Sequence, residues 1–135
     1  VGRINLGANP EQAIKVLREA EAYNGPSLVI AYCHCIAHGI AMDKGLEQQK
    51  KAVESGHWIL MHYNPELKKE GKNPLTIDCK EPTLPLKDYI YNETRYKRLT
   101  ITNPEAAEAL LKAEEKDLRN RWNLYKYLSE MPVEA

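Results

Sequence analysis

The chain carries no excess charge of either sign. Its 135 residues include 19 Lys and Arg side chains and 19 Asp and Glu side chains. A formal net charge of zero gives no electrostatic reason to expect a nucleic acid or an anionic membrane surface as a partner. Any indication of function must therefore come from local motifs.

Long apolar runs and glycine-rich loops are also missing. No apolar run approaches the length of about 20 residues that spans a bilayer, and no signal-peptide pattern opens the sequence. Neither a GxGxxG loop nor a Walker sequence occurs. The sequence thus predicts neither a membrane span nor a glycine-rich phosphate loop.

Cysteine is scarce, with three residues in the whole chain. An odd number leaves one thiol unpaired, so the cysteines do not form a closed disulfide framework. This usage is typical of a reducing compartment, where a Cys is more often a ligand, a nucleophile or an inert buried residue. We expect a cytoplasmic location.

The pattern of turns and apolar residues predicts one α/β domain. Three Asn-Pro-Glu triplets, at 9–11, 64–66 and 103–105, each supply an N-cap oxygen, a Pro for the first helical position and a carboxylate for the first turn. The first helix is expected to turn Ile14 and Leu17 inward. Strand, helix and strand follow within about thirty residues, which predicts a βαβ unit with parallel strands. Helices are expected at 9–23, 46–55, 86–99 and 104–129, and strands at 27–33, 58–63 and 75–77.

The most informative stretch is LVIAYCHCIAHG at 28–39. Its apolar first half is typical of a strand covered on both faces. Polar side chains at the carboxyl end of such a strand stand where open α/β sheets bind ligands. Alternation along an extended chain places Cys33 and Cys35 on one side and His34 on the other.

Three readings of these side chains stay open from the residues alone. A small zinc-binding or structural domain could use Cys33, Cys35 and His38, with His57 as a further ligand, although the C-x-C spacing differs from the usual zinc knuckle. A thiol activated by a neighbouring histidine is a second reading. Two inert thiols that complete a core strand are the third. Cys79, in a polar stretch, is expected to be a free surface thiol.

Three segments in combination resemble a known family. They are GPSLVIAYCHCIAHG at 25–39, GLEQQK at 45–50 and SGHW at 55–58. The chain is similar to the C-terminal end of the pyruvate:ferredoxin (flavodoxin) oxidoreductases, large single-chain enzymes that use thiamine diphosphate and iron–sulfur clusters. The likeness covers essentially all of the chain. Its opening, VGRINLG, reads as a strand already under way, so we expect a fragment of a longer polypeptide.

The resemblance implies a fold and a domain division. The expected fold is a partial thiamine-diphosphate-binding type, with parallel strands, crossover helices and a long C-terminal helix. Residues 1–103 would form the C-terminal portion of the thiamine-binding domain, and residues 104–135 a helical flank. The expected partners are the rest of the parent polypeptide and a second copy of the enzyme in a homodimer.

The resemblance also implies a chemistry. Family members decarboxylate pyruvate oxidatively on thiamine diphosphate and Mg²⁺, pass electrons through [4Fe–4S] clusters to ferredoxin or flavodoxin, and transfer the acyl group to coenzyme A. The cluster nearest the thiamine takes three cysteines from an earlier part of the chain and one distant Cys, which falls on Cys35. Cys33 stands where a small residue such as Ala or Ser is expected. A Gly-Asp-Gly motif for thiamine diphosphate and the C-x₂-C-x₂-C pattern are both missing, so this chain alone is expected to be inactive.

Overall fold

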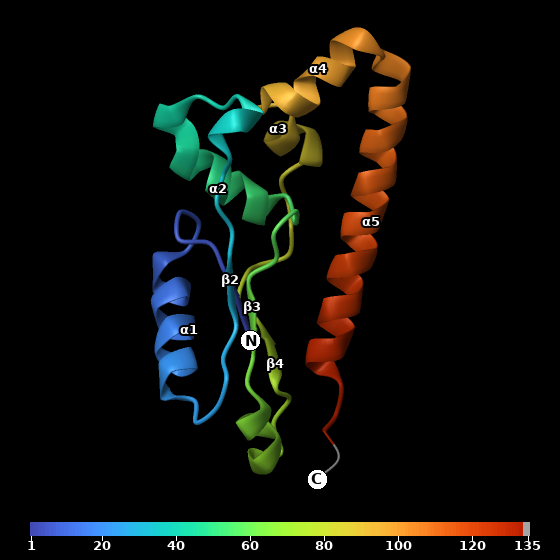
Figure 1. Ribbon diagram of the computed structural model, residues 1–135. Helices are drawn as coiled ribbons and strands as arrows, with labels where there is room; N and C mark the ends of the chain where they lie inside the picture. The colour runs from blue at the N-terminus through green and yellow to red at the C-terminus, as the bar shows by residue number, and fades with distance from the viewer. Residues whose placement is uncertain (134–135) are drawn as a thin grey trace.

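A four-stranded mixed sheet forms the centre of the computed structural model, which describes residues 1–133 (Figure 1). The strands lie in the order β2-β1-β3-β4. Strands β1 and β2 are parallel, whereas β3 is antiparallel to both β1 and β4. The α/β class is confirmed, and β1 and β2 are the expected parallel pair with a crossover helix. The other two pairings are antiparallel, and β3 and β4 are joined by the short segment 64–74 and not by a crossover helix. The bounds are β1 Gly2–Ile4, β2 Val29–Ala31, β3 Met61–Tyr63 and β4 Leu75–Ile77.

Helix α1 (Pro10–Ala22) covers one face of the sheet (Figure 1). It begins as predicted, because the side chain of Asn9 accepts a hydrogen bond of 3.0 Å from the amide of Gln12. Ala13 and Val16 pack against β1 and β2. Ile14 and Leu17, expected to face inward, are 52% and 50% exposed.

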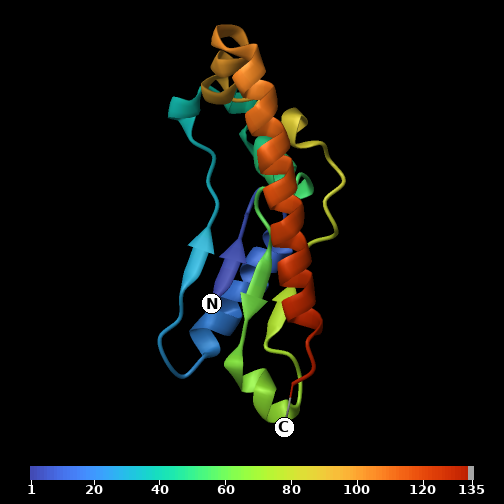
Figure 2. The same ribbon diagram turned by 90° about the vertical axis from the view of Figure 1, so that its right-hand side faces the viewer.

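Helix α5 (Pro104–Glu130) lies on the other face, alongside β4 (Figure 2). It confirms the predicted C-terminal helix; positions 134 and 135 of the expected flank lie outside the described residues. No helix among residues 1–133 is long and apolar enough to cross a membrane.

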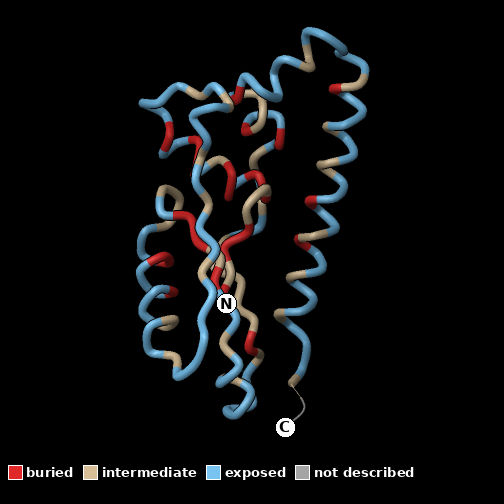
Figure 3. The backbone as a smooth tube through the Cα atoms, in the orientation of Figure 1, coloured by how far each residue is buried: buried red, intermediate tan, exposed pale blue. Residues whose placement is uncertain are grey.

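Helices α2, α3 and α4 and the short η1 and η2 gather beyond the carboxyl ends of β1 and β2, whereas η3 lies at the opposite end, between β3 and β4 (Figure 1). The single helix predicted over 86–99 is two helices, because Glu93 between them is extended, with φ −99° and ψ 121°, and its side chain is buried. Ala52, Leu86, Tyr89 and Leu118 form the core cluster of this half, where buried residues of several elements meet (Figure 3). The bounds are η1 Ile36–His38, η2 Met42–Lys44, α2 Gly45–Glu54, η3 Pro65–Glu70, α3 Leu86–Ile90 and α4 Thr94–Thr102.

Two predicted strands are shorter than expected. The strand at 27–33 is regular only over Val29–Ala31, and it lies at the edge of the sheet. Leu28 and Ile30 are 56% and 42% exposed, so coverage on both faces is wrong for this chain. The strand at 58–63 is reduced to Met61–Tyr63, because the amide of Trp58 bonds the carbonyl of Ala52 at the end of α2 instead of joining the sheet.

Candidate functional site

The segment after β2, residues 32–39, is called the cysteine loop below. Ala31 at the end of β2 pairs with Ile4 at the end of β1, so the loop leaves the sheet at the carboxyl end of its parallel pair. Cys33 and Cys35 are both exposed. Cys35 has extended backbone (φ −106°, ψ 121°) and accepts a hydrogen bond of 3.0 Å on its carbonyl from the amide of His38. This one-turn structure presents the Cys35 thiol at the protein surface.

The amino-terminal half of the loop is fixed by Tyr32 and His34. The hydroxyls of Tyr32 and Tyr89 share a hydrogen bond of 2.6 Å. Nε2 of Gln49 donates to Nδ1 of His34 at 3.0 Å. A Cβ at Gly45 would lie 2.6 Å from the His34 ring, so glycine at the start of α2 lets the imidazole pack closely. Both contacts tie the residues beside the cysteines to the helical half of the molecule.

The carboxyl-terminal half is fixed by His38 and Gly39. Nδ1 of His38 donates to Oε2 of Glu93 at 2.7 Å, while Nε2 accepts from Arg95 at 3.0 Å. Gly39 has a left-handed backbone with φ +73°, and its carbonyl accepts from both the amide and the hydroxyl of Thr94. A side chain at Gly39 would be strained and would meet Thr94 at 2.8 Å. The loop is therefore anchored on both sides of Cys35.

The anchors are buried polar groups with partners. Glu93 is 2% exposed, and its second carboxylate oxygen accepts from Nε2 of Gln48 at 3.1 Å. The same amide of Gln48 donates to the carbonyl of Tyr89 at 3.0 Å. Burial raises the pKa of the Tyr89 and Tyr32 hydroxyls, so both phenols stay neutral at physiological pH. Satisfied buried networks of this kind rigidify the backbone that they join.

The structure does not form the zinc site considered for Cys33, Cys35 and His38. Both ring nitrogens of His38 are already engaged, by Glu93 and Arg95. Within residues 1–133, no group of three or more His, Cys, Asp or Glu side chains is arranged to hold a metal ion. A complete metal site from this set is therefore wrong for the chain by itself.

A thiol activated by histidine is not formed either. The thiol of Cys33 donates to the backbone carbonyl of His34 at 3.4 Å, and Nδ1 of His34 is engaged by Gln49. His57 packs on Tyr89, with the ring centroids 4.9 Å apart, and burial lowers its pKa. The reading of two buried, inert thiols also fails, because both cysteines of the loop are exposed.

Cys79 is half-buried, and not the surface thiol that its polar neighbours predict. Its Sγ donates to the carbonyl of Leu60 at 3.7 Å, and burial raises the pKa of the thiol. Cys79, two residues after β4, thus packs against Leu60, the residue before β3. Neither its position nor its protonation favours a reactive role.

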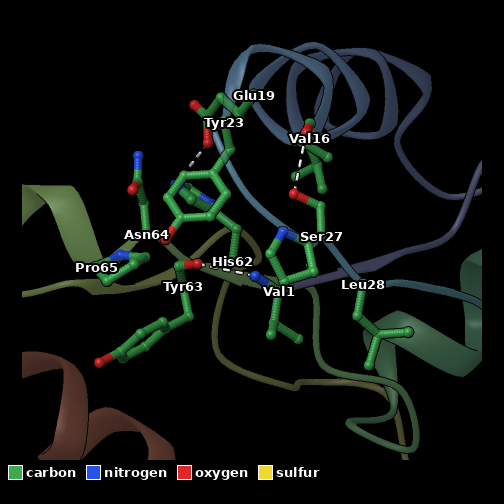
Figure 4. A pocket seen from close by; sticks show the side chains of 13 residues that line it. Val1, Val16, Glu19, Tyr23, Ser27, Leu28, His62, Tyr63, Asn64 and Pro65 are labelled. Carbon is green, nitrogen blue, oxygen red and sulfur yellow. Dashed lines mark hydrogen bonds and ion pairs between the residues drawn. The ribbon is translucent and has the colours of Figure 1, made fainter.

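A separate pocket of about 190 Å³ lies at the other end of β1 and β2 (Figure 4). His62 and Glu19 line it, with Nε2 of His62 3.6 Å from a Glu19 carboxylate oxygen. Nδ1 of His62 donates to Asp78 at 2.7 Å. His62 is 7% exposed, so it is a packed side chain. The pocket and the cysteine loop stand at opposite ends of the parallel strands.

Sequence reasoning missed the side chains that hold the loop, Gln48, Glu93 and Arg95. They come from α2 and from the start of α4, 13 to 60 residues beyond Cys35 by the printed numbering. Glu93 lies inside the single helix that the sequence predicts over 86–99, where nothing marks it as a buried partner of the loop. The one local signal that the helix is interrupted near Glu93 is the run Asn92-Glu93-Thr94, whose composition is common at helix starts.

Comparison with known proteins gives close relatives. No protein-family model matches the chain. The chain is similar to the pyruvate-flavodoxin oxidoreductases of Trichormus variabilis, at 49% identity over 133 residues, and of Nostoc sp., at 48% over 129 residues. The pyruvate:ferredoxin oxidoreductase of Moorella thermoacetica is 47% identical over 130 residues. These alignments cover 98%, 96% and 96% of the chain, but the chain spans only about 11% of the length of each relative.

Proposed function

We propose that this chain, which is homologous over nearly its whole length to one segment of the pyruvate-flavodoxin and pyruvate:ferredoxin oxidoreductases, is part of such an enzyme. Residues 1–103 serve as the C-terminal portion of its thiamine-diphosphate-binding domain, and residues 104–135 as a helical flank. The parent enzyme is cytoplasmic and homodimeric, and it decarboxylates pyruvate oxidatively to acetyl-coenzyme A. Its electrons leave to ferredoxin or flavodoxin.

Within that enzyme, we assign to Cys35 the role of one ligand of the [4Fe–4S] cluster nearest the thiamine diphosphate. The observation that carries this assignment is the exposed thiol of Cys35 on a loop anchored on both sides. A cubane takes four Cys thiolates, one of which can be distant in sequence. When bound, the cluster accepts and passes on single electrons.

The side chains that the structure describes do not form a complete cluster site. Cys33 and Cys35 are the two exposed thiols of the loop, and residues 1–133 gather no larger set of metal-binding side chains. The remaining three ligands must come from elsewhere in the parent polypeptide. The motif for thiamine diphosphate and Mg²⁺ is likewise missing from the sequence, so the isolated chain is inactive.

The loop residues position the thiolate. His34 is held by Gln49, and His38 is held by Glu93 and Arg95, so the backbone on either side of Cys35 is fixed. A fixed ligand keeps the distance between the cluster and its redox partner constant. The protein part of the chemistry at this site is therefore orientation, with both ring nitrogens of His38 engaged in anchoring the loop.

The test uses the full-length parent enzyme, purified without oxygen. Cys35→Ala is expected to lose one cluster's share of iron and acid-labile sulfide and to uncouple pyruvate oxidation from ferredoxin or flavodoxin reduction, while thiamine diphosphate binding survives. Cys33→Ser is the matched control on the same loop and is expected to keep its iron. Full iron content and full electron transfer in Cys35→Ala would assign the ligand to another residue.

A further inference from the structure

The face of the sheet that α5 occupies is only half covered. Arg3 faces α5, where it lies near Arg121 and Tyr125. Side chains alternate along a strand, and paired residues share a face. Ile30 pairs with Arg3, so Ile30 lies on this same face, and so do Val1 and Leu28, two residues before each of them.

Four apolar or aromatic side chains of this face remain open to solvent. Val1, Leu28, Ile30 and Tyr63 are 58%, 56%, 42% and 38% exposed, and together they are called the uncovered sheet face. Figure 4 shows Val1, Leu28 and Tyr63 pointing away from α1. Figure 2 shows α5 alongside β4, with β2 at the opposite edge of the sheet. A contiguous patch of this kind marks an interaction surface.

The outer edge of β2 is open as well. β2 is the last strand of the sheet, with β1 as its one neighbour among the described residues. The carbonyl of Leu28 and the amide of Tyr32 bond to β1. Because the bonding direction alternates along the strand, the amides and carbonyls of Val29 and Ala31 point to the opposite side.

β2 is very short, which is one protection of an exposed edge, but its sequence carries none of the other devices. Natural edge strands are blunted by lysine, proline, inward charges or bulges. Residues 28–33 read LVIAYC, with no charged residue and no proline, and the strand pairs with β1 in unbroken register. Both the composition and the geometry are those of an internal strand.

We infer that the outer edge of β2 and the uncovered sheet face form the docking surface for another segment of the same parent polypeptide. That segment adds a strand along Val29 and Ala31 and lays an apolar side over Leu28 and Ile30. The length of the relatives indicates the occupant, since the chain matches over at least 96% of its own residues but spans only about 11% of each relative. The inference rests on the proposed function only for the identity of the parent.

This placement also joins the docking surface to the cysteine loop. β2 runs directly into residues 32–39, so a strand paired along its edge lies beside the start of that loop. The docked segment would thereby shield one side of a loop whose two thiols are exposed in this chain.

The first test is hydrogen exchange of the wild-type full-length enzyme, resolved to single residues. In an edge strand only the amides directed at the neighbour are protected, whereas in an internal strand all are. We expect Val29, Ile30 and Ala31 to exchange equally slowly, roughly 100-fold or more below the unstructured rate. Protection at Ile30 with fast exchange at Val29 and Ala31 would overturn the inference.

The second test identifies the occupant. A photo-crosslinking amino acid replaces Leu28 in the full-length enzyme, with the exposed Arg98 position on α4 as the matched control. A link from position 28 to a peptide of the same polypeptide outside these 135 residues supports the inference. A link to residues 1–133 of a second copy, or no link above the control, would overturn it. Iron loss in Cys35→Ala is measured separately, so either proposal can fail without the other.

Discussion

The carboxylate of Glu93 accepts a hydrogen bond of 2.7 Å from Nδ1 of His38, although the two residues lie 55 positions apart. Glu93 is 2% exposed, whereas the His38 side chain is 25% exposed. A buried carboxylate is tolerated only when it is well paired, and here Gln48 supplies the second bond. The pair joins the cysteine loop to the junction between α3 and α4.

The first prediction concerns this pair. His38→Ala leaves the Glu93 carboxylate buried with Gln48 as its remaining side-chain donor, and should lower the free energy of unfolding by about 2–3 kcal/mol. Adding Glu93→Gln to that variant should restore part of the loss, since the buried charge is then removed. Urea unfolding of the single and double variants gives the coupling between the residues.

A surface ion pair serves as the control for that cycle. Lys51 lies 2.8 Å from Glu47 on the exposed side of α2. Glu47→Ala should leave the urea midpoint unchanged, because exposed pairs contribute little. Additive losses in the His38 and Glu93 variants, with no coupling, would contradict an anchoring role for the pair.

The second prediction concerns Asp78. Burial raises the pKa of this carboxyl, but hydrogen bonds from His62 and Gln12 outweigh burial, and the net pKa is lowered. The unfolded chain therefore takes up the proton at a higher pH than the folded chain. The stabilisation is fully present above the unfolded value near pH 4 and is lost as the pH falls through the folded pKa.

Asp78→Asn should accordingly lower the free energy of unfolding by about 1–2 kcal/mol at pH 7. The difference in free energy of unfolding between this variant and the wild-type chain should shrink toward zero as the pH falls below about 4. Gln12→Leu removes one of the two hydrogen bonds to Asp78. Its free energy of unfolding should therefore depend on pH to an intermediate degree. Thermal unfolding between pH 2 and 7 measures all three proteins. If the loss of stability in Asp78→Asn did not change with pH, the ionisation of Asp78 would be excluded as its cause.

Local signals in the sequence predict the elements that local forces determine. The side chains of Asn9, Asn64 and Asn103 each cap the amide that follows two or three residues later, because N-cap geometry needs only adjacent residues. The predicted strand at Leu75–Ile77 and the predicted βαβ unit of β1, α1 and β2 are also confirmed.

The predictions that prove wrong concern features that depend on contacts between residues far apart in the sequence. Ile14 and Leu17 look like the core face of α1, but Gln12 faces the sheet, where it donates to the carbonyl of Arg3 and to Asp78. The split of the helix at 86–99 depends on Glu93 and His38, which pair only in the folded chain. The exposure of Ile30 depends on which residues far along the chain cover its face, and none of the described residues does so fully.

The third prediction concerns His57. Burial lowers the pKa of its imidazole, and Nδ1 has no hydrogen-bond partner in the described structure. The unfolded chain therefore binds a proton first as the pH falls below about 6.5, and stability declines from there toward the folded pKa. His57→Phe keeps an aromatic ring against Tyr89 and removes the unpaired nitrogen.

At pH 8, the free energy of unfolding of the His57→Phe variant should equal that of the wild-type chain or exceed it by about 1 kcal/mol. Its stability should also be flatter between about pH 7 and 5, because the protonation that favours unfolding is gone. Urea midpoints at several pH values provide the measurement. An undiminished slope in the variant would assign the pH dependence to another group.

The fourth prediction concerns the start of α5. The side chain of Asn103 accepts a hydrogen bond of 3.0 Å from the amide of Ala106, one of the amides that a helix leaves unpaired at its start. Asn103→Ala removes this acceptor and should lower the free energy of unfolding by about 1 kcal/mol. Asn103→Ser, which restores an acceptor, should recover most of the loss.

Asn123 provides a control of opposite sign on the same helix. It is exposed in the helix interior, where alanine has the higher helix propensity, so Asn123→Ala should raise the free energy of unfolding by a few tenths of a kcal/mol. The same substitution is thus destabilising at residue 103 and mildly stabilising at residue 123. Urea unfolding monitored by helical circular dichroism distinguishes the two. Equal changes at both positions would mean that the Asn103 cap does not stabilise α5.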